Sequence, residues 1–96
     1  MDSGANMIRV HVFISGRVQG VGFRNFTRSK AEELDIAGWV KNLEDGRVEA
    51  VFAGKANKVK EILKSIRKGP TFAKVDDIES KQEEYVGEFS DFQIVF

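Results

Sequence analysis

The sequence predicts a two-layer α/β fold, in which a mixed β-sheet carries two helices on one face. Three observations lead to this fold class. Short segments rich in alternating or β-branched apolar residues are interleaved with two amphipathic helical patterns, and each helical pattern follows a strand. The chain of 96 residues suffices for one hydrophobic core of modest size.

The first predicted strand covers residues 8–15, IRVHVFIS, where an apolar β-branched residue stands at every second position. A glycine-containing loop follows. A helix is then predicted over residues 23–35, FRNFTRSKAEELD, because its apolar residues share one face and its charged residues lie opposite. Residues 1–7 precede the first strand and are predicted to be a flexible leader, since MDSGAN is small and polar.

The rest of the chain supplies further strands, a turn and a second helix. This helix has apolar residues at i, i+3, i+6, i+7 and i+10 and ends at a Gly-Pro pair. The turn has the sequence EDG, in which Asp and Gly tolerate the backbone angles of a hairpin. The predicted ranges are strand 39–43, turn 44–46, strand 47–53, helix 55–68, strand 73–80 and a possible short fifth strand at 92–96.

One arrangement of these elements satisfies the right-handed crossover rule for a strand–helix–strand unit. The first two strands run parallel, the strand at 47–53 lies antiparallel between them, and the strand at 73–80 pairs on the other side of the first. With both helices on one face of this mixed sheet, the fold is a ferredoxin-like sandwich of order β-α-β-β-α-β. Because the parallel strands end at one edge, we expect the glycine loop and Asn42 to lie together.

The composition excludes several classes of function. Basic and acidic side chains are equal in number, 15 of each, which argues against a nucleic-acid-binding surface. The chain has no cysteine and a single histidine, His11, so thiol catalysis, a histidine-based triad and a zinc site of several histidines are excluded. No apolar run reaches the length of a membrane span, and we expect a cytoplasmic protein with no membrane partner.

The loop after the first strand, GRVQGVGFR at residues 16–24, contains three glycines and two arginines. It is not a P-loop, because Phe23 and Arg24 stand where Lys and Ser or Thr are required. It is not a dinucleotide-binding fingerprint, whose third glycine would fall at Asn25. Glycines nevertheless let successive N–H groups form an anion-binding nest, and the N-terminus of the next helix adds further N–H groups.

Arg24 lies in the first turn of the helix after this loop. A cation there opposes the helix dipole at a cost of about 0.3–1 kcal/mol when it is exposed, and a bound anion would reverse the sign of this cost. A guanidinium also donates two parallel hydrogen bonds to a phosphate. The loop is therefore a candidate cradle for one tetrahedral oxyanion, although a plain tight turn with Arg24 in solvent is equally compatible with the residues alone.

Two segments taken together, GRVQGVGFR at 16–24 and GWVKNLEDGRVEAVFAG at 38–54, closely resemble the acylphosphatase family. KGPTFAKVDDIE at 68–79 is also similar to the family's segment after its second helix. The resemblance implies a ferredoxin-like domain over residues 8–96 that hydrolyses acyl phosphates, the mixed anhydrides of a carboxylic acid and phosphoric acid. It implies no metal and no organic cofactor. Related domains also occur inside larger carbamoyl-transfer proteins.

The resemblance also implies roles for individual residues. Arg24 matches the family's phosphate-binding arginine and Asn42 its water-orienting asparagine, so both are expected to be catalytic. The loop amides expected to bind phosphate beside Arg24 belong to Gln19, Gly20, Val21, Gly22 and Phe23. In the mechanism that follows, Asn42 holds one water in line with phosphorus, and the substrate phosphate accepts the proton of that water.

The expected partners are a small-molecule acyl phosphate and, as competing anions, inorganic phosphate or sulfate. The protein is expected to be a monomer that binds no nucleic acid.

Two rival functions fit parts of the sequence. An open sheet face with Phe13 could bind RNA or a regulator. The zero net charge and the lack of an RNP1-like run argue against this function. A phosphate-binding domain without catalysis would need the loop but not Asn42. His11 is expected to be structural or exposed, on the face away from the helices.

Overall fold

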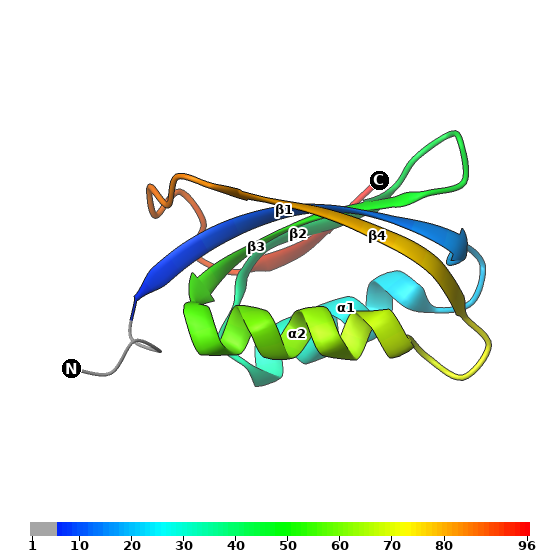
Figure 1. The fold of residues 1–96 in the computed structure, drawn as a ribbon, viewed down its shortest axis with the longest axis horizontal. Coiled ribbons are helices and arrows are strands. Elements are labelled where there is room, and N and C mark those ends of the chain that lie inside the picture. Colours follow the sequence, from blue (N-terminus) through cyan, green and yellow to red (C-terminus); the bar gives the residue numbers. More distant parts are fainter. Residues whose placement is uncertain (1–5) are drawn as a thin grey trace.

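The computed structural model describes residues 6–96, in which a five-stranded sheet forms one layer and two helices form the other (Figure 1). The predicted fold class is confirmed. The predicted leader falls largely outside the described residues and stays a prediction. The elements in chain order are β1 (Met7–Arg17), α1 (Phe23–Glu33), β2 (Ala37–Asn42), β3 (Val48–Lys55), α2 (Ala56–Lys68), β4 (Lys74–Glu83) and β5 (Phe92–Val95).

The strand order in the sheet is β4-β1-β3-β2-β5. Strand β3 pairs antiparallel with both β1 and β2, which therefore run parallel to each other. Strand β4 pairs antiparallel with the other edge of β1, and both helices cover the same face of the sheet (Figure 1). This is the predicted ferredoxin-like topology. The short strand β5 adds to β2 in parallel, a position that the sequence did not specify.

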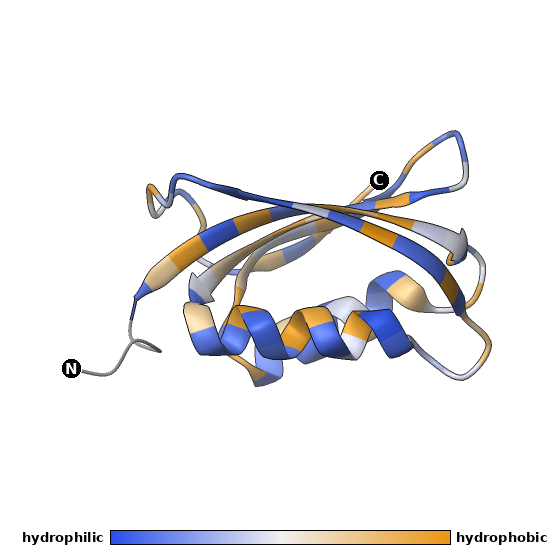
Figure 2. Ribbon diagram, in the orientation of Figure 1, coloured by the Kyte–Doolittle hydropathy of each residue, from blue (hydrophilic) through white to orange (hydrophobic). Residues whose placement is uncertain are grey.

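The hydrophobic core lies between the sheet and the two helices. Val12 and Ile14 of β1 are fully buried on the helix-facing side, and α2 buries Val59, Ile62 and Ile66 against them. Apolar and polar residues alternate along the strands and around α2 in the way that this two-layer packing requires (Figure 2). Neither helix of the described chain is long and apolar enough to cross a membrane.

Several element boundaries differ from those predicted, and the differences in β1, β4 and α1 have reasons in long-range pairing and local backbone. Strands β1 and β4 are longer than predicted, because they pair with each other from Arg9 opposite Glu83 to Arg17 opposite Lys74. Helix α1 ends at Glu33, before the predicted residue 35, because the chain reverses at Asp35, which has a positive φ of 56°. Strand β1 thus takes up the start of the predicted glycine loop, but Gly20 and Gly22 stay outside it, and Asn42 is the last residue of β2.

Phe92 anchors β5 to the core, and its loss is expected to destabilise the fold. Its ring stacks on that of Phe52 with centroids 5.8 Å apart, and the residue is 4% exposed. Phe92→Ala should lower the free energy of unfolding by about 3–5 kcal/mol, because it leaves a cavity beside Phe52 in the core. Urea denaturation measures the change. Gln93→Ala, at the exposed neighbouring position, should stay within about 0.5 kcal/mol of the parent. Similar small losses in both variants would contradict this role of Phe92.

Candidate functional site

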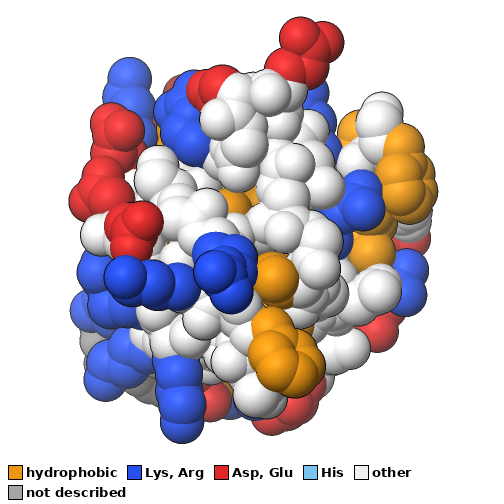
Figure 3. Space-filling view, turned by 90° about the vertical axis from the view of Figure 1, so that its right-hand side faces the viewer, with side chains coloured by type: hydrophobic (Ala, Val, Ile, Leu, Met, Phe, Trp, Pro, Cys, Tyr) orange, Lys and Arg blue, Asp and Glu red, His pale blue; other side chains and the backbone are white. Residues whose placement is uncertain are grey.

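A cavity of about 390 Å³ opens at the end of the sheet where β1 and β2 finish. Figure 3 looks onto this end of the molecule, where Lys and Arg side chains gather on one side of the face. The cavity wall comes from the loop after β1, the first turn of α1, the end of β2 and the last residues of the chain. The lining residues are Val18, Gly20, Gly22, Phe23, Arg24, Asn25, Asn42, Ile94 and Phe96.

The loop between β1 and α1 presents backbone donors beside this cavity. Gly20 and Gly22 have φ values of +72° and +79°, and a Cβ atom on either would meet nothing within 4 Å. Glycine is therefore required here for the left-handed backbone and not for space. In the part of the chain that the structure describes, no N–H group of residues 19–22 donates to a backbone carbonyl. The loop thus keeps a row of N–H groups available for a ligand.

Arg24 brings a positive charge to the same wall. It is half-buried in the first turn of α1, a turn that contains no acidic residue and begins at Gly22 without a side-chain cap. The ion pairs found among the described residues do not include Arg24. Its guanidinium carbon lies 5.0 Å from the centroid of the Phe96 ring. The positive end of the helix and the arginine therefore act together on the cavity, an arrangement that favours an anion.

Asn42 supplies a hydrogen-bond acceptor to the lining of the cavity. It is the last residue of β2 and pairs with Val48 of β3. Its side-chain Oδ1 is buried and has no hydrogen-bond partner among the described residues. A buried polar atom without a partner costs about 1–3 kcal/mol and is uncommon in folded proteins. This oxygen is available to accept a hydrogen bond from a molecule bound in the cavity.

Five of the seven predicted site residues line the cavity, and the side chains of the other two lie elsewhere, which leaves the predicted role of their backbone N–H groups a prediction. The five are Gly20, Gly22, Phe23, Arg24 and Asn42. Val21 is half-buried and packs against the hydrophobic core. The side chain of Gln19 reaches the hairpin between β2 and β3, where its Nε2 donates to the carbonyls of Leu43 at 2.8 Å and Arg47 at 2.9 Å. Gln19 and Val21 are not among the residues that line the cavity.

Sequence reasoning missed four residues that line the cavity. Val18 and Asn25 stand beside the predicted site residues in the chain, whereas Ile94 and Phe96 come from its last segment. The alternation in FQIVF indicated a short strand but carried no information on its partner. The parallel pairing of β5 with β2, with Val40 opposite Ile94, is what brings these residues to the cavity. Such pairing depends on contacts between residues that are distant in the sequence.

Local contacts hold the hairpin that follows Asn42. The pKa of Asp45 is lowered, first because the backbone N–H of Arg47 donates to its carboxylate at 3.0 Å and second because the Arg47 side chain donates to it at 2.8 Å. The guanidinium carbon of Arg47 also lies 4.9 Å from the ring centroid of Phe13. Arg47 is thus engaged on the outer face of the sheet and is not a residue of the cavity wall.

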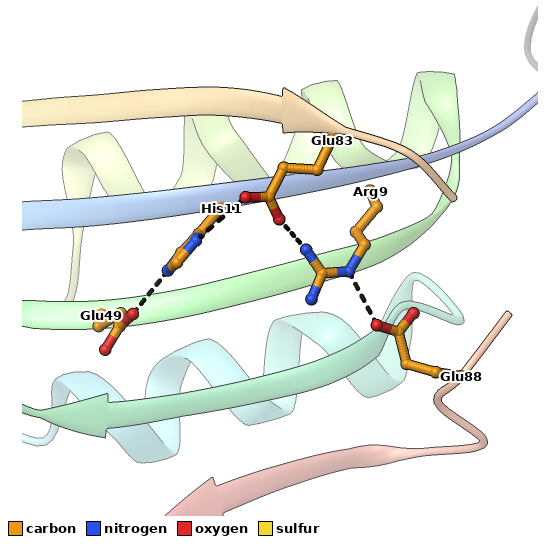
Figure 4. Close-up of polar contacts among 5 residues, drawn as sticks. All are labelled: Arg9, His11, Glu49, Glu83 and Glu88. Atoms are coloured by element: carbon orange, nitrogen blue, oxygen red, sulfur yellow. Dashed lines mark hydrogen bonds and ion pairs between the residues drawn. The ribbon is translucent and has the colours of Figure 1, made fainter. Parts of the chain in front are cut away.

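A second polar cluster lies on the outer face of the sheet, away from the helices (Figure 4). His11 contacts Glu49 at 2.6 Å through Nε2 and Glu83 at 3.5 Å through Nδ1. Arg9 pairs with Glu83 and, at 3.0 Å, with Glu88. The polar groups of this cluster contact one another within the chain, and none of these residues lines the cavity. The cluster links strands of the sheet and supports the structural interpretation of His11.

Comparisons with known proteins agree with these features. The family model described as Acylphosphatase matches residues 10–94. A protein named Acylphosphatase from Syntrophobacter fumaroxidans is 51% identical over 88 residues, which cover 92% of this chain and 91% of the relative. The crystal structure of acylphosphatase from Bacillus subtilis aligns with a TM-score of 0.90 at 37% identity, covering 93% of this chain and 99% of that one. The structure of an acylphosphatase from Coxiella burnetii aligns with a TM-score of 0.88 at 40% identity, covering 94% of each chain.

Inorganic phosphate and sulfate are expected to raise the midpoint of thermal unfolding, because an anion that binds only the folded state stabilises it by mass action. Arg24→Ala should lose most of this shift. Arg28→Ala is the matched control, since Arg28 is exposed on the same helix and does not line the cavity. Calorimetry at constant ionic strength, with chloride as the reference anion, measures the shift. An equal shift in the parent and in Arg24→Ala would mean that the anion binds elsewhere.

Proposed function

The chain belongs to the acylphosphatase family and hydrolyses the carboxyl–phosphate bond of acyl phosphates, and from this premise we propose that its cavity aligns a water molecule with the substrate's phosphorus. The observation that carries the proposal is the buried, unpartnered Oδ1 of Asn42 in the same wall as Arg24. An amide oxygen only accepts hydrogen bonds, so it suits a water O–H group and is unsuited to an ionised phosphate oxygen. A site that merely binds phosphate would have no use for this atom.

The phosphate group of the substrate would be bound by the loop and by Arg24. The guanidinium donates to two phosphate oxygens at once, and the N–H groups of the loop and of the first turn of α1 surround the third. These donors are in place before the substrate arrives, as the φ values of Gly20 and Gly22 set the loop. Preorganised donors follow the charge on the phosphoryl oxygens into the transition state and lower its free energy.

The chemical step then needs little more than alignment. The oxygen of the water that Asn42 orients attacks phosphorus, and the bond between phosphorus and the acyl oxygen breaks. The bonding electrons leave with the carboxylate, which is a good leaving group, and a phosphoryl oxygen takes the water's proton. The products are a carboxylate and inorganic phosphate. Phosphoryl transfer of this kind depends mainly on positioning and on charge stabilisation.

The donor set of the cavity fits a reaction without a metal. The lining residues, all within the described part of the chain, include no carboxylate side chain and no imidazole, which are the usual ligands of catalytic metal ions. Arg24 takes the place that a cation would occupy beside the phosphate. Action as a monomer and a cytoplasmic location stay expectations from the sequence.

Substitutions of Asn42 and Arg24 should separate water orientation from phosphate binding. Asn42→Ala should lower kcat by ~10²-fold or more, the scale for a lost transition-state interaction, while the inhibition constant of inorganic phosphate stays nearly unchanged. Arg24→Ala should lower kcat/KM by at least ~10²-fold and also weaken phosphate inhibition, because this side chain contacts the phosphate in the ground state. Steady-state hydrolysis of benzoyl phosphate, with phosphate as a competitive inhibitor, measures both quantities.

Two controls accompany these variants. Asn57→Ala changes an exposed asparagine of α2, and Arg28→Ala an exposed arginine of α1; neither residue lines the cavity. Both should keep the parent kinetics. If Asn42→Ala weakened phosphate inhibition as strongly as it lowered kcat, Asn42 would be a phosphate ligand; if kcat were unchanged, the proposed orientation of water would be wrong.

Hydrolysis of benzoyl phosphate should proceed unchanged in an excess of EDTA, because the proposed groups that bind the phosphate and the water are an arginine, backbone amides and an asparagine. The rate of phosphate release is measured before and after prolonged dialysis against the chelator. If EDTA abolished the reaction and Mg²⁺ restored its rate, the metal-free mechanism would be refuted.

A further inference from the structure

Gln19 connects the phosphate loop to the hairpin that carries Asn42. Its Nε2 donates to the carbonyl oxygen of Leu43 at 2.8 Å and to that of Arg47 at 2.9 Å. These two carbonyls face each other across the base of the β2–β3 hairpin, and Leu43 follows Asn42 directly in the chain. One side-chain amide therefore joins the loop after β1 to the end of β2.

The hairpin does not need Gln19 to satisfy its backbone. The carbonyl of Leu43 already accepts a hydrogen bond from the N–H of Gly46 at 3.2 Å, and the carbonyl of Arg47 accepts one from the N–H of Leu43 at 2.8 Å. Removing the Gln19 amide would leave neither oxygen without a donor. The two extra hydrogen bonds act between the loop and the hairpin rather than within the hairpin.

The Gln19 end of this connection is also well anchored. The preceding residue, Val18, is 1% exposed and belongs to the hydrophobic core, so the backbone at Gln19 is held relative to the sheet. The following residue, Gly20, has the positive φ that begins the row of free N–H groups. Gln19 is not among the residues that line the cavity, and its side chain contacts the hairpin instead.

We propose that Gln19 is a positioning residue, which fixes the distance between the phosphate loop and Asn42 and so keeps the oriented water in line with phosphorus. This inference rests on the role proposed above for Asn42. In-line attack is sensitive to such placement, since a displacement of about 1 Å can lower a rate by ~10²-fold. Within the sheet, β3 separates β1, which precedes the loop, from β2, which ends at Asn42.

Gln19→Met tests the inference, because methionine has nearly the same length but no N–H donor. We expect kcat for benzoyl phosphate to fall by ~10-fold or more, with KM and the inhibition constant of inorganic phosphate changing by less than ~3-fold. In the Asn42→Ala background the same substitution should change kcat by less than ~2-fold, since the residue that Gln19 positions is then absent. Gln82→Met, at an exposed position on β4, is the matched control and should keep the parent kinetics.

The outcomes distinguish this inference from the proposed function. Suppose that Asn42→Ala lowers kcat as expected. The positioning role of Gln19 is then refuted if Gln19→Met lowers kcat by the same factor with and without Asn42, or if it weakens phosphate inhibition as much as it lowers kcat. The role of Asn42 stands in both cases. If Asn42→Ala leaves kcat unchanged, the proposed orientation of water fails and the inference fails with it. Should Gln19→Met not fold, Gln19→Asn gives the same comparison, because its amide is one methylene short of the two carbonyls.

Discussion

The position of β3 between β1 and β2 is the constraint on which the site depends. Because β3 pairs antiparallel with both neighbours, β1 and β2 run parallel and finish at the same end of the sheet. Residues of β3 such as Ala50 and Phe52 are fully buried, so the strand cannot exchange places with a more polar edge strand such as β4 without exposing them. The burial of β3 thus brings Arg24 and Asn42 to one cavity, although neither side chain belongs to that strand.

The cavity collects two features that are unfavourable in the protein without ligand. Arg24 stands at the positive end of a helix, and Asn42 buries an oxygen that has no partner among the described residues. A phosphate and a water would compensate these features together. The core between the sheet and α2 lies beside the cavity and supplies the stability that tolerates them. Such local strain at a functional site, compensated elsewhere in the fold, is common in enzymes.

The zero net charge conceals two different electrostatic regions. On the outer face, His11 and Arg9 lie among the carboxylates of Glu49, Glu83 and Glu88 and contact them directly (Figure 4). The cavity wall holds Arg24 with no acidic side chain among its lining residues. The outer face is therefore occupied by contacts within the chain, whereas the cavity presents its positive charge to small anions. Total charge excluded a broad polyanion-binding surface but could not reveal this separation.

The sequence by itself determined the features that depend on neighbouring residues: the alternation in β1, the apolar stripe of α2, the glycine loop, and Arg24 in the first turn of α1. Local patterns also sufficed for the topology, because the handedness of strand–helix–strand units leaves few alternatives. Only the tertiary structure decided where β5 pairs, that Phe96 lies beside Arg24, and that Gln19 turns from the cavity to the hairpin. These features depend on contacts between residues far apart in the chain, and the pattern of a loop or a short strand does not specify which distant partner its side chains will meet.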